Sequence, residues 1–310
     1  MFSNQHKDLL GLRTATREEI TRVLDLAEEM RQVLLSDHKK TSDLAGKSVV
    51  TLFYENSTRT RMSFELASKY MGASSANMTA TASSVQKGET LLDTGATLDQ
   101  MGVDVIIIRH AMSGAPHLLA KHVKASVINA GDGVNEHPTQ ALLDLFTLRR
   151  HLGDLSGKKV AIVGDVLHSR VARSNAYGLH AMGAQVVFAG PTTLMPGEDL
   201  SPLHAQVAGS VEEAVRDADA VMGLRIQRER QHAGLFPSVR EYSRFFGVGE
   251  EVLSLAKPGA LLMHPGPVNR GVELTTQVAD AEQSVIREQV QNGVAVRMAL
   301  LQLLIRREAL

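Results

Sequence analysis

Short runs of β-branched residues alternate with longer amphipathic stretches along the whole chain of 310 residues. This alternation is typical of βαβ units, in which helices cover both faces of a parallel sheet. We predict strands at Val49–Tyr54, Ser74–Thr79, Val105–Arg109, Ser126–Asn129, Lys159–Val163, Gln185–Ala189, Ala220–Leu224 and Ala260–Met263. The sequence therefore predicts an α/β protein of two domains, each a parallel β-sheet flanked by helices, joined by interdomain helices.

Three long helical patterns complete this prediction. Thr16–Leu35 precedes the first sheet, and Thr139–Leu152 has the apolar spacing of a stiff connecting helix that ends before a glycine. The last pattern, from Ala281 to Leu310, contains Asn292 and Gly293, which we interpret as a bend or a break.

The connecting helix places the domain boundary near residue 153. We expect a first domain at 1–152, a second at 153–285, and a C-terminal helix at 286–310 that packs back on the first domain.

The charge balance limits the kinds of partner. The chain has 33 Lys and Arg against 34 Asp and Glu, so it has no global basic field for nucleic acid or for an anionic membrane. It has no Cys, which excludes disulfides, thiol catalysis and thiolate zinc sites and is compatible with a reducing cytoplasm. The N-terminus lacks the pattern of a secretory signal, and no run approaches the roughly 20 apolar residues of a membrane span. We therefore expect a cytoplasmic protein without a membrane or nucleic-acid partner.

A cluster of hydroxyl and guanidinium groups follows the first predicted strand. Residues Ser57-Thr58-Arg59-Thr60-Arg61 open a helix, where unpaired main-chain N–H groups and the helix dipole favour an anion. Arginine adds a planar fork that fits phosphate. The alternative is an ordinary N-cap with solvated arginines. Two arginines and three hydroxyls within five residues favour the anion site.

Three segments in the first half carry a family resemblance. FYENSTRTRMSFE, IIIRH and HPTQALLDL resemble motifs of the aspartate and ornithine carbamoyltransferase family, and further motifs extend the resemblance over nearly the whole chain. By this resemblance Ser57, Thr58, Arg59 and Thr60 bind the phosphate of carbamoyl phosphate, whereas Arg61 is structural.

The same resemblance assigns the groups that polarise the carbamoyl carbonyl. Arg109, His137 and Thr60 would face the carbonyl oxygen, with Gln140 on the same helical face as His137. Viewed alone, His137 is compatible with a helix cap and Arg109 with a surface charge that closes a strand.

The segment SSVQKGET resembles a family loop that completes the active site of a neighbouring subunit. Ser83 is then a ligand of carbamoyl phosphate, and Lys87 a catalytic and aspartate-binding residue. The resemblance implies a homotrimer with shared active sites. A mobile surface turn is the alternative.

The second half begins like a dinucleotide-binding unit, but Gly164 is followed by DVL and no G-x-G-x-x-G is present. This absence disfavours a nicotinamide dehydrogenase. Arg170 instead matches the family arginine that binds a carboxylate of aspartate, and GLRIQRER resembles the loop in which Arg225 and Gln227 bind the same substrate. The alternative for this run is a solvated charged face.

Two further motifs favour aspartate over ornithine as the substrate that accepts the carbamoyl group. HPTQ, with Thr139, and HPGP are similar to the aspartate branch, whereas ornithine enzymes have Cys in the first motif and H-C-L-P in place of the second. In HPGP the main chains of Pro265 and Gly266 would bind the carbamoyl or amino nitrogen, and His264 is structural. Ornithine remains the nearest alternative acceptor.

The resemblance implies transfer of the carbamoyl group from carbamoyl phosphate to the amino group of L-aspartate, in de novo pyrimidine (UMP) biosynthesis. It implies neither a metal nor an organic cofactor. Further assembly with regulatory chains or with dihydroorotase is compatible with it, and a non-catalytic scaffold of the same fold is a third possibility.

Overall fold

The computed structural model describes residues 2–3, 7–79, 88–197, 201–226 and 238–306. It divides into two compact units, the first formed by Met1–Phe146 with Gln291–Leu310 and the second by Thr147–Val290. The chain changes unit inside helix α5 (Pro138–Leu152) and again inside helix α11 (Ile286–Arg306). Each unit contains one sheet flanked by helices, which confirms the predicted fold class.

The first sheet has the strand order β1-β2-β6-β5-β3-β4. The strands are β1 (Phe2–Ser3), β2 (Asp8–Leu9), β3 (Ser48–Phe53), β4 (Ser74–Thr79), β5 (Val105–His110) and β6 (Ser126–Asp132). All neighbours pair in parallel except β1 with β2. The four strands predicted in this half are confirmed, with β4 matching at both ends and β6 continuing to Asp132.

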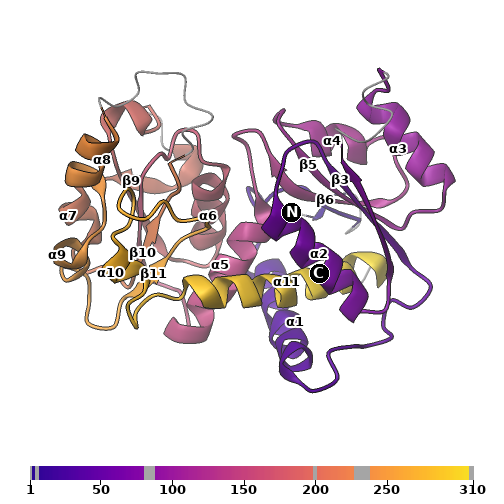
Figure 1. The fold of residues 1–310 in the computed structure, drawn as a ribbon, viewed down its shortest axis with the longest axis horizontal. Coiled ribbons are helices and arrows are strands. Elements are labelled where there is room, and N and C mark those ends of the chain that lie inside the picture. Colours follow the sequence, from indigo (N-terminus) through magenta and orange to yellow (C-terminus); the bar gives the residue numbers. More distant parts are fainter. Residues whose placement is uncertain (1, 4–6, 80–87, 198–200, 227–237, 307–310) are drawn as a thin grey trace. The chain divides into compact units, whose positions relative to one another are not determined.

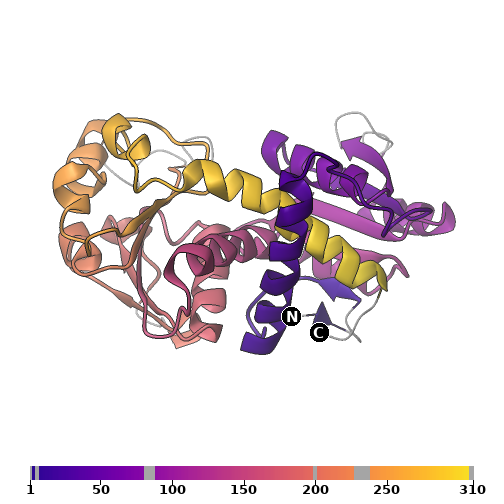
Figure 2. The same cartoon turned by 90° about the horizontal axis from the view of Figure 1, so that it is seen from below.

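Alternate residues of β3 and β5 point to opposite faces of this sheet. Val50 and Leu52 of β3, with Ile106 and Ile108 of β5, form a buried cluster with α3 (Leu91–Gln100) and α4 (Ala115–Ala120). Figures 1 and 2 show α1, α2 and the last part of α11 on the other side of the sheet. Both faces of the first sheet are therefore covered.

Helix α1 (Arg17–Leu35) begins with a capping box and matches the helix predicted before the first sheet. The Glu19 N–H donates to the Thr16 hydroxyl at 3.2 Å, and the Thr16 N–H donates to the Glu19 carboxylate at 2.8 Å. Two main-chain donors at the helix start are thereby satisfied.

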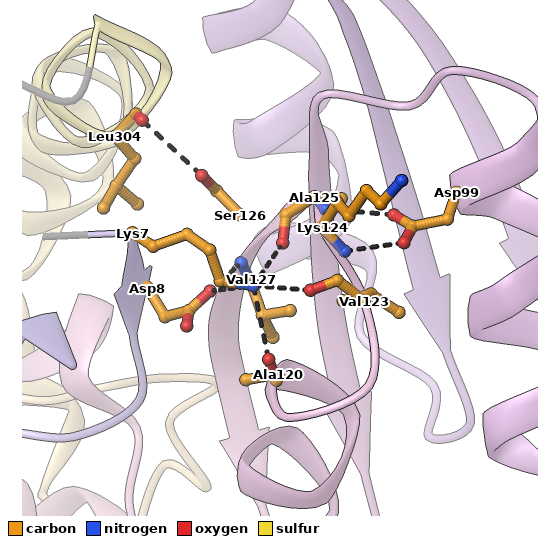
Figure 3. A network of polar contacts seen from close by, with 10 residues as sticks. All are labelled: Lys7, Asp8, Asp99, Ala120, Val123, Lys124, Ala125, Ser126, Val127 and Leu304. Carbon is orange, nitrogen blue, oxygen red and sulfur yellow. Dashed lines mark hydrogen bonds and ion pairs between the residues drawn. The ribbon is translucent and has the colours of Figure 1, made fainter. Parts of the chain in front are cut away.

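A polar network fixes β2 to the first sheet (Figure 3). Asp8 Oδ1 accepts the Val127 N–H at 2.8 Å, and Lys7 Nζ donates to the carbonyls of Ala120, Val123 and Ala125 at 3.2, 2.7 and 3.0 Å. The ammonium group thus lies at the C-terminal end of α4, where the helix dipole favours a cation.

The second sheet has the order β11-β10-β7-β8-β9 and is parallel throughout. Its strands are β7 (Lys159–Val163), β8 (Gln185–Ala189), β9 (Ala205–Val207), β10 (Ala220–Gly223) and β11 (Leu261–Met263). The four predicted strands of this half are confirmed, and β9 is additional.

Helices cover both faces of the second sheet. A buried cluster joins its strands to α7 (Val211–Val215), α9 (Glu250–Leu253) and α10 (Thr276–Ala279). Figure 1 shows α6 (Arg170–Ala181) on the opposite side. One further helix, α8 (Val239–Phe246), belongs to this unit.

The break predicted as one possibility at Asn292 and Gly293 is wrong, because α11 continues through both residues. A Cβ atom on Gly293 would lie 2.5 Å from Arg297 Nη1 and 3.1 Å from Leu143 Cδ2. Glycine is therefore needed at this position for close packing rather than for a break.

Within the described part of the chain, no helix is long and apolar enough to cross a membrane.

Candidate active site

The predicted anion site lies at the start of α2 (Thr58–Tyr70), directly after β3. Ser57 is the N-cap, but its hydroxyl makes no capping hydrogen bond, whereas Ser169 caps α6 by accepting the Ala172 N–H at 3.1 Å. The first main-chain bond of the helix runs from the Arg61 N–H to the Ser57 carbonyl at 3.2 Å. The first turn of an α-helix has no carbonyl four residues earlier within the helix for its N–H groups, and such a helix start favours an anion.

The side chains of this turn differ in exposure. Thr58 and Arg59 are exposed, Ser57 and Arg61 are half-buried, and Thr60 is 7% exposed. Hydroxyl groups and a guanidinium group thus surround the helix start at different depths.

Arg109 lies on the same edge of the sheet, because β3 and β5 pair in parallel with Phe53 opposite Arg109. Its Nη1 donates to the Ala130 carbonyl at 3.2 Å, and its Nε lies 3.4 Å from Glu55 Oε2. The Arg109 and Glu55 side chains are each 14% exposed. The guanidinium is thus held beside the turn that leads into α2.

His110 follows Arg109 and accepts the Met112 N–H through Nδ1 at 2.9 Å. Burial lowers the pKa of His110, and the carboxylates of Glu55 and Asp132 only partly oppose this effect. A neutral imidazole is therefore expected beside the site at pH 7.

The loop between β6 and α5 is organised by Asp132, which is completely buried. Its carboxylate accepts hydrogen bonds from the side chains of Asn129 and Asn135 and from the N–H groups of Gly114 and Glu136, at 2.7–3.3 Å. This network fixes the main chain directly before His137 and α5.

His137 and Gln140 lie at the start of α5 and are 4% and 9% exposed. The Gln140 side chain donates to Asp144 Oδ1 at 2.9 Å, which leaves its carbonyl oxygen and one N–H for other contacts. Thr139, which lies between these two residues in the sequence, is completely buried. The predicted residues of the first unit therefore lie at or just after the ends of β3, β5 and β6, which meet at one sheet edge because the strands are parallel.

Arg297 of α11 and Asp144 were not predicted as part of this region. Arg297 Nη1 donates to Ser63 Oγ of α2 at 2.9 Å, and its guanidinium lies 5.0 Å from the ring centre of Phe64. An arginine in an apolar helical stretch is the only signal of this arrangement in the sequence.

The predicted residues of the second unit also follow neighbouring strands. β10 lies between β7 and β11, with Gly223 opposite Val163 and Met222 opposite Met263. Arg170 begins the helix after β7, Arg225 follows β10, and Pro265 with Gly266 follows β11. The two cations and the HPGP turn are thus placed at one sheet edge.

Arg170 is 4% exposed, whereas Arg225, Pro265 and Gly266 are half-buried. Gly164, before α6, has φ +136°, and an added Cβ would lie 2.9 Å from Leu224 Cβ. This glycine allows a close approach of two strand ends and is not part of a dinucleotide fingerprint.

Ser83, Lys87 and Gln227 lie outside the described residues. Among the residues that are described, no group of three or more His, Cys, Asp or Glu side chains could hold a metal ion.

Two family models match the chain. The model for the carbamoyl-phosphate-binding domain of aspartate/ornithine carbamoyltransferases matches residues 7–150, and that for the aspartate/ornithine-binding domain matches residues 156–304.

The chain is similar to individual proteins over nearly its full length. It is 66% identical to the aspartate carbamoyltransferase catalytic subunit of Ruminiclostridium cellulolyticum, over 97% of this chain and 96% of that protein. It resembles the structure of Trypanosoma cruzi aspartate transcarbamoylase in complex with N-(phosphonacetyl)-L-aspartic acid, with a TM-score of 0.87, 30% identity and 97% coverage of both chains. The ornithine carbamoyltransferase of Pyrococcus furiosus gives a TM-score of 0.87 at 31% identity, with 97% of both chains covered. The fold alone therefore does not distinguish the two acceptors.

Proposed function

This chain belongs to the aspartate/ornithine carbamoyltransferase family, and from this premise we propose that it transfers the carbamoyl group of carbamoyl phosphate to the amino group of L-aspartate. The products are N-carbamoyl-L-aspartate and phosphate, and the reaction is a step of de novo pyrimidine biosynthesis. The observation that carries this proposal is the meeting of the α2 N-terminus and Arg109 at one sheet edge. The choice of aspartate rests on the 66% identity to a catalytic subunit of that name.

Carbamoyl phosphate binds to the first unit. Its phosphate accepts hydrogen bonds from the first-turn N–H groups of α2, from the hydroxyls of Ser57, Thr58 and Thr60, and from Arg59. The uncapped state of the Ser57 hydroxyl supports this role, because a hydroxyl used for capping would offer less to a ligand.

The carbamoyl oxygen is polarised by Arg109, His137 and Thr60, with Gln140 beside them. As the amine attacks the carbonyl carbon, a C–N bond forms, the C–O bond to phosphate breaks, and negative charge develops on the carbonyl oxygen. Preorganised donors of this kind contribute roughly 3 kcal/mol each to stabilisation of the transition state. The departing phosphate accepts the proton from the amine.

Aspartate binds to the second unit. Its two carboxylates require two cationic partners, for which Arg170 and Arg225 are suited, together with Gln227. The carbonyls of Pro265 and Gly266 accept hydrogen bonds from the carbamoyl or amino nitrogen. The position of these residues at the ends of β7, β10 and β11 supports the assignment.

Ser83 and Lys87 complete the site from a neighbouring subunit of a cytoplasmic homotrimer. If so, mixing inactive Arg59→Ala and Lys87→Ala proteins should restore part of the activity after subunit exchange. Proven exchange without recovered activity would contradict a shared site. Assembly with regulatory chains or dihydroorotase can be tested by co-purification with those chains.

The activity is tested by supplying carbamoyl phosphate with either aspartate or ornithine and separating the products. We expect carbamoyl-aspartate, and Arg109→Ala should lower kcat by roughly 100-fold to 1,000-fold. Lys69→Ala is the control, because Lys69 lies on α2 but its side chain is 56% exposed and pairs with Glu65. A preference for ornithine would overturn the acceptor assignment.

A further inference from the structure

Two segments of the second unit that the proposed function uses are joined by a side chain that it does not use. Arg225 follows β10, and Pro265 with Gly266 follows β11. The half-buried side chain of Asn269 donates from Nδ2 to the Ile226 carbonyl at 3.2 Å. Asn269 therefore connects the loop after β11 to the main chain next to Arg225.

Glu273 fixes Asn269 in this position. Its Oε1 accepts the Asn269 N–H at 2.6 Å, and its Oε2 accepts from Asn269 Nδ2 at 3.2 Å. The two amide hydrogens of Asn269 are thus directed to two different acceptors, the Glu273 carboxylate and the Ile226 carbonyl. Glu273 is 2% exposed, so water does not compete for these contacts.

His264 extends the network to the HPGP turn. The Gly266 N–H donates to His264 Nδ1 at 2.7 Å, so Nδ1 carries no hydrogen and the neutral ring has its hydrogen on Nε2. This Nε2 lies 3.2 Å from Glu273 Oε1 and donates to it. A continuous chain of hydrogen bonds therefore runs from Gly266 through His264, Glu273 and Asn269 to Ile226.

The segment after β10 needs such support. β10 ends at Gly223, and the Leu224 N–H still donates to the Val163 carbonyl at 2.8 Å. Beyond this point Asn269 holds the carbonyl of Ile226, whose side chain is completely buried. Because Arg225 directly precedes Ile226, fixing the main chain at Ile226 also fixes the Cα atom from which the Arg225 side chain extends.

We propose that Asn269 is a positioning residue for the carbamoyl acceptor. By holding the main chain at Ile226, it keeps the neighbouring Arg225 at a fixed distance from the Pro265–Gly266 turn. This inference rests on the proposed function, because it takes Arg225 as a ligand of the aspartate carboxylate.

Two substitutions separate a hydrogen-bonding role of Asn269 from one in which it only fills space. Asn269→Ala removes the two hydrogen bonds that the side chain donates and leaves that of the main-chain N–H. Asn269→Asp keeps the shape but directs carboxylate oxygens at the Ile226 carbonyl and the Glu273 carboxylate, so acceptors face acceptors. If Asn269 positions Arg225, the Asp variant is the more defective; if it only fills space, the Asp variant is the closer to the wild type.

Steady-state kinetics on the full-length protein give the test. In Asn269→Ala the aspartate KM should rise about fivefold to tenfold, since losing a hydrogen bond of about 1 kcal/mol corresponds to about fivefold in affinity. The KM for carbamoyl phosphate should change less than about twofold, because its proposed phosphate ligands Ser57–Thr60 belong to the other unit and the Gly266 N–H keeps its hydrogen bond to His264 in this variant. Equal increases in both KM values, or a lower melting temperature with an unchanged aspartate KM, would overturn the inference.

A double-mutant cycle with Arg225→Ala separates this inference from the proposed function. If Asn269 acts through Arg225, adding Asn269→Ala to Arg225→Ala should raise the aspartate KM by less than about twofold further. Full multiplication of the two effects would refute only the positioning role. A normal aspartate KM in Arg225→Ala alone would refute the proposed aspartate site and the inference with it.

Discussion

Replacing Arg297 by methionine tests how much a buried charge stabilises the packing of α11 against α2, the helix that begins at the predicted anion site. Arg297 is 4% exposed, and its Nη1 donates to Ser63 Oγ and to the Gly293 carbonyl, each at 2.9 Å. Burial lowers the pKa of Arg297 to about 10, and attraction to Asp144 opposes this effect. The guanidinium is therefore still charged at pH 7.

The magnitude follows from what the substitution removes. Two hydrogen bonds from a charged donor contribute roughly 3–6 kcal/mol, and the cation–π contact with Phe64 adds roughly 1 kcal/mol. Against this, the lowered pKa corresponds to a net electrostatic cost of burial of roughly 3 kcal/mol, with the attraction to Asp144 already included, and methionine does not incur this cost. The free energy of unfolding should fall by about 1–4 kcal/mol, a range that overlaps the cost of removing one partner of a buried ion pair.

Urea unfolding followed by circular dichroism measures this loss. Part of it comes from leaving Asp144 buried, so Arg297→Met combined with Asp144→Asn should recover about 1–3 kcal/mol. Arg287→Met is the control, because Arg287 lies on the same helix with its side chain 95% exposed. A loss below about 1 kcal/mol, or a double variant no more stable than Arg297→Met alone, would refute the reasoning.

Three further substitutions have defined outcomes. Gly133→Ala should lower the free energy of unfolding by about 1–3 kcal/mol, because Gly133 has φ +47° and an added Cβ would lie 2.7 Å from the Ser113 main-chain nitrogen; unchanged urea unfolding would contradict this strain. Thr16→Ala removes the capping box of α1 and should cost about 1 kcal/mol in the same assay, whereas an equal loss in Thr16→Ser would show that capping is not the cause. Burial works to raise the pKa of Asp219, but hydrogen bonds from a main-chain N–H and from Lys257 outweigh it and lower the pKa. The stability that this carboxylate contributes is therefore present above its unfolded pKa of about 3.9 and is lost as pH falls through the lower folded value. Melting temperatures of Asp219→Asn should fall less steeply than those of the wild type below about pH 4, and parallel curves would exclude this role.

Helices and strands could be predicted from the sequence where the segment is long enough to show its hydrophobic pattern. β7 and β8 were predicted at both ends from their apolar runs, and α1 was predicted from its cap to Leu35. β1, β2 and β9 contain only two or three residues, too few to display an alternation. At Gly293 the sequence signal was misread, since a glycine that breaks a helix and one that admits a neighbouring side chain look alike in sequence.

The candidate site shows the same limit. Residues after parallel strands could be predicted to converge, because every strand of such a sheet ends at the same edge. The side chains that support them could not, because their partners are distant in the chain, as with Asn269 and Ile226 or Arg297 and Ser63. Asp132 is closer in the chain to its partners Asn129, Asn135 and Glu136. Several polar residues near the end of a predicted strand were a signal that could have suggested its role.

The passage of the chain through α5 and again through α11 has a consequence for synthesis on the ribosome. The second unit is one continuous stretch, Thr147–Val290, and can fold as soon as it has emerged. The first unit lacks residues 291–306 until translation has passed the entire second unit, and until then the contacts of Ser63 and Phe64 with Arg297 cannot form. Domains usually fold in the order in which they are made. Here the unit that is started first is the unit that is finished last.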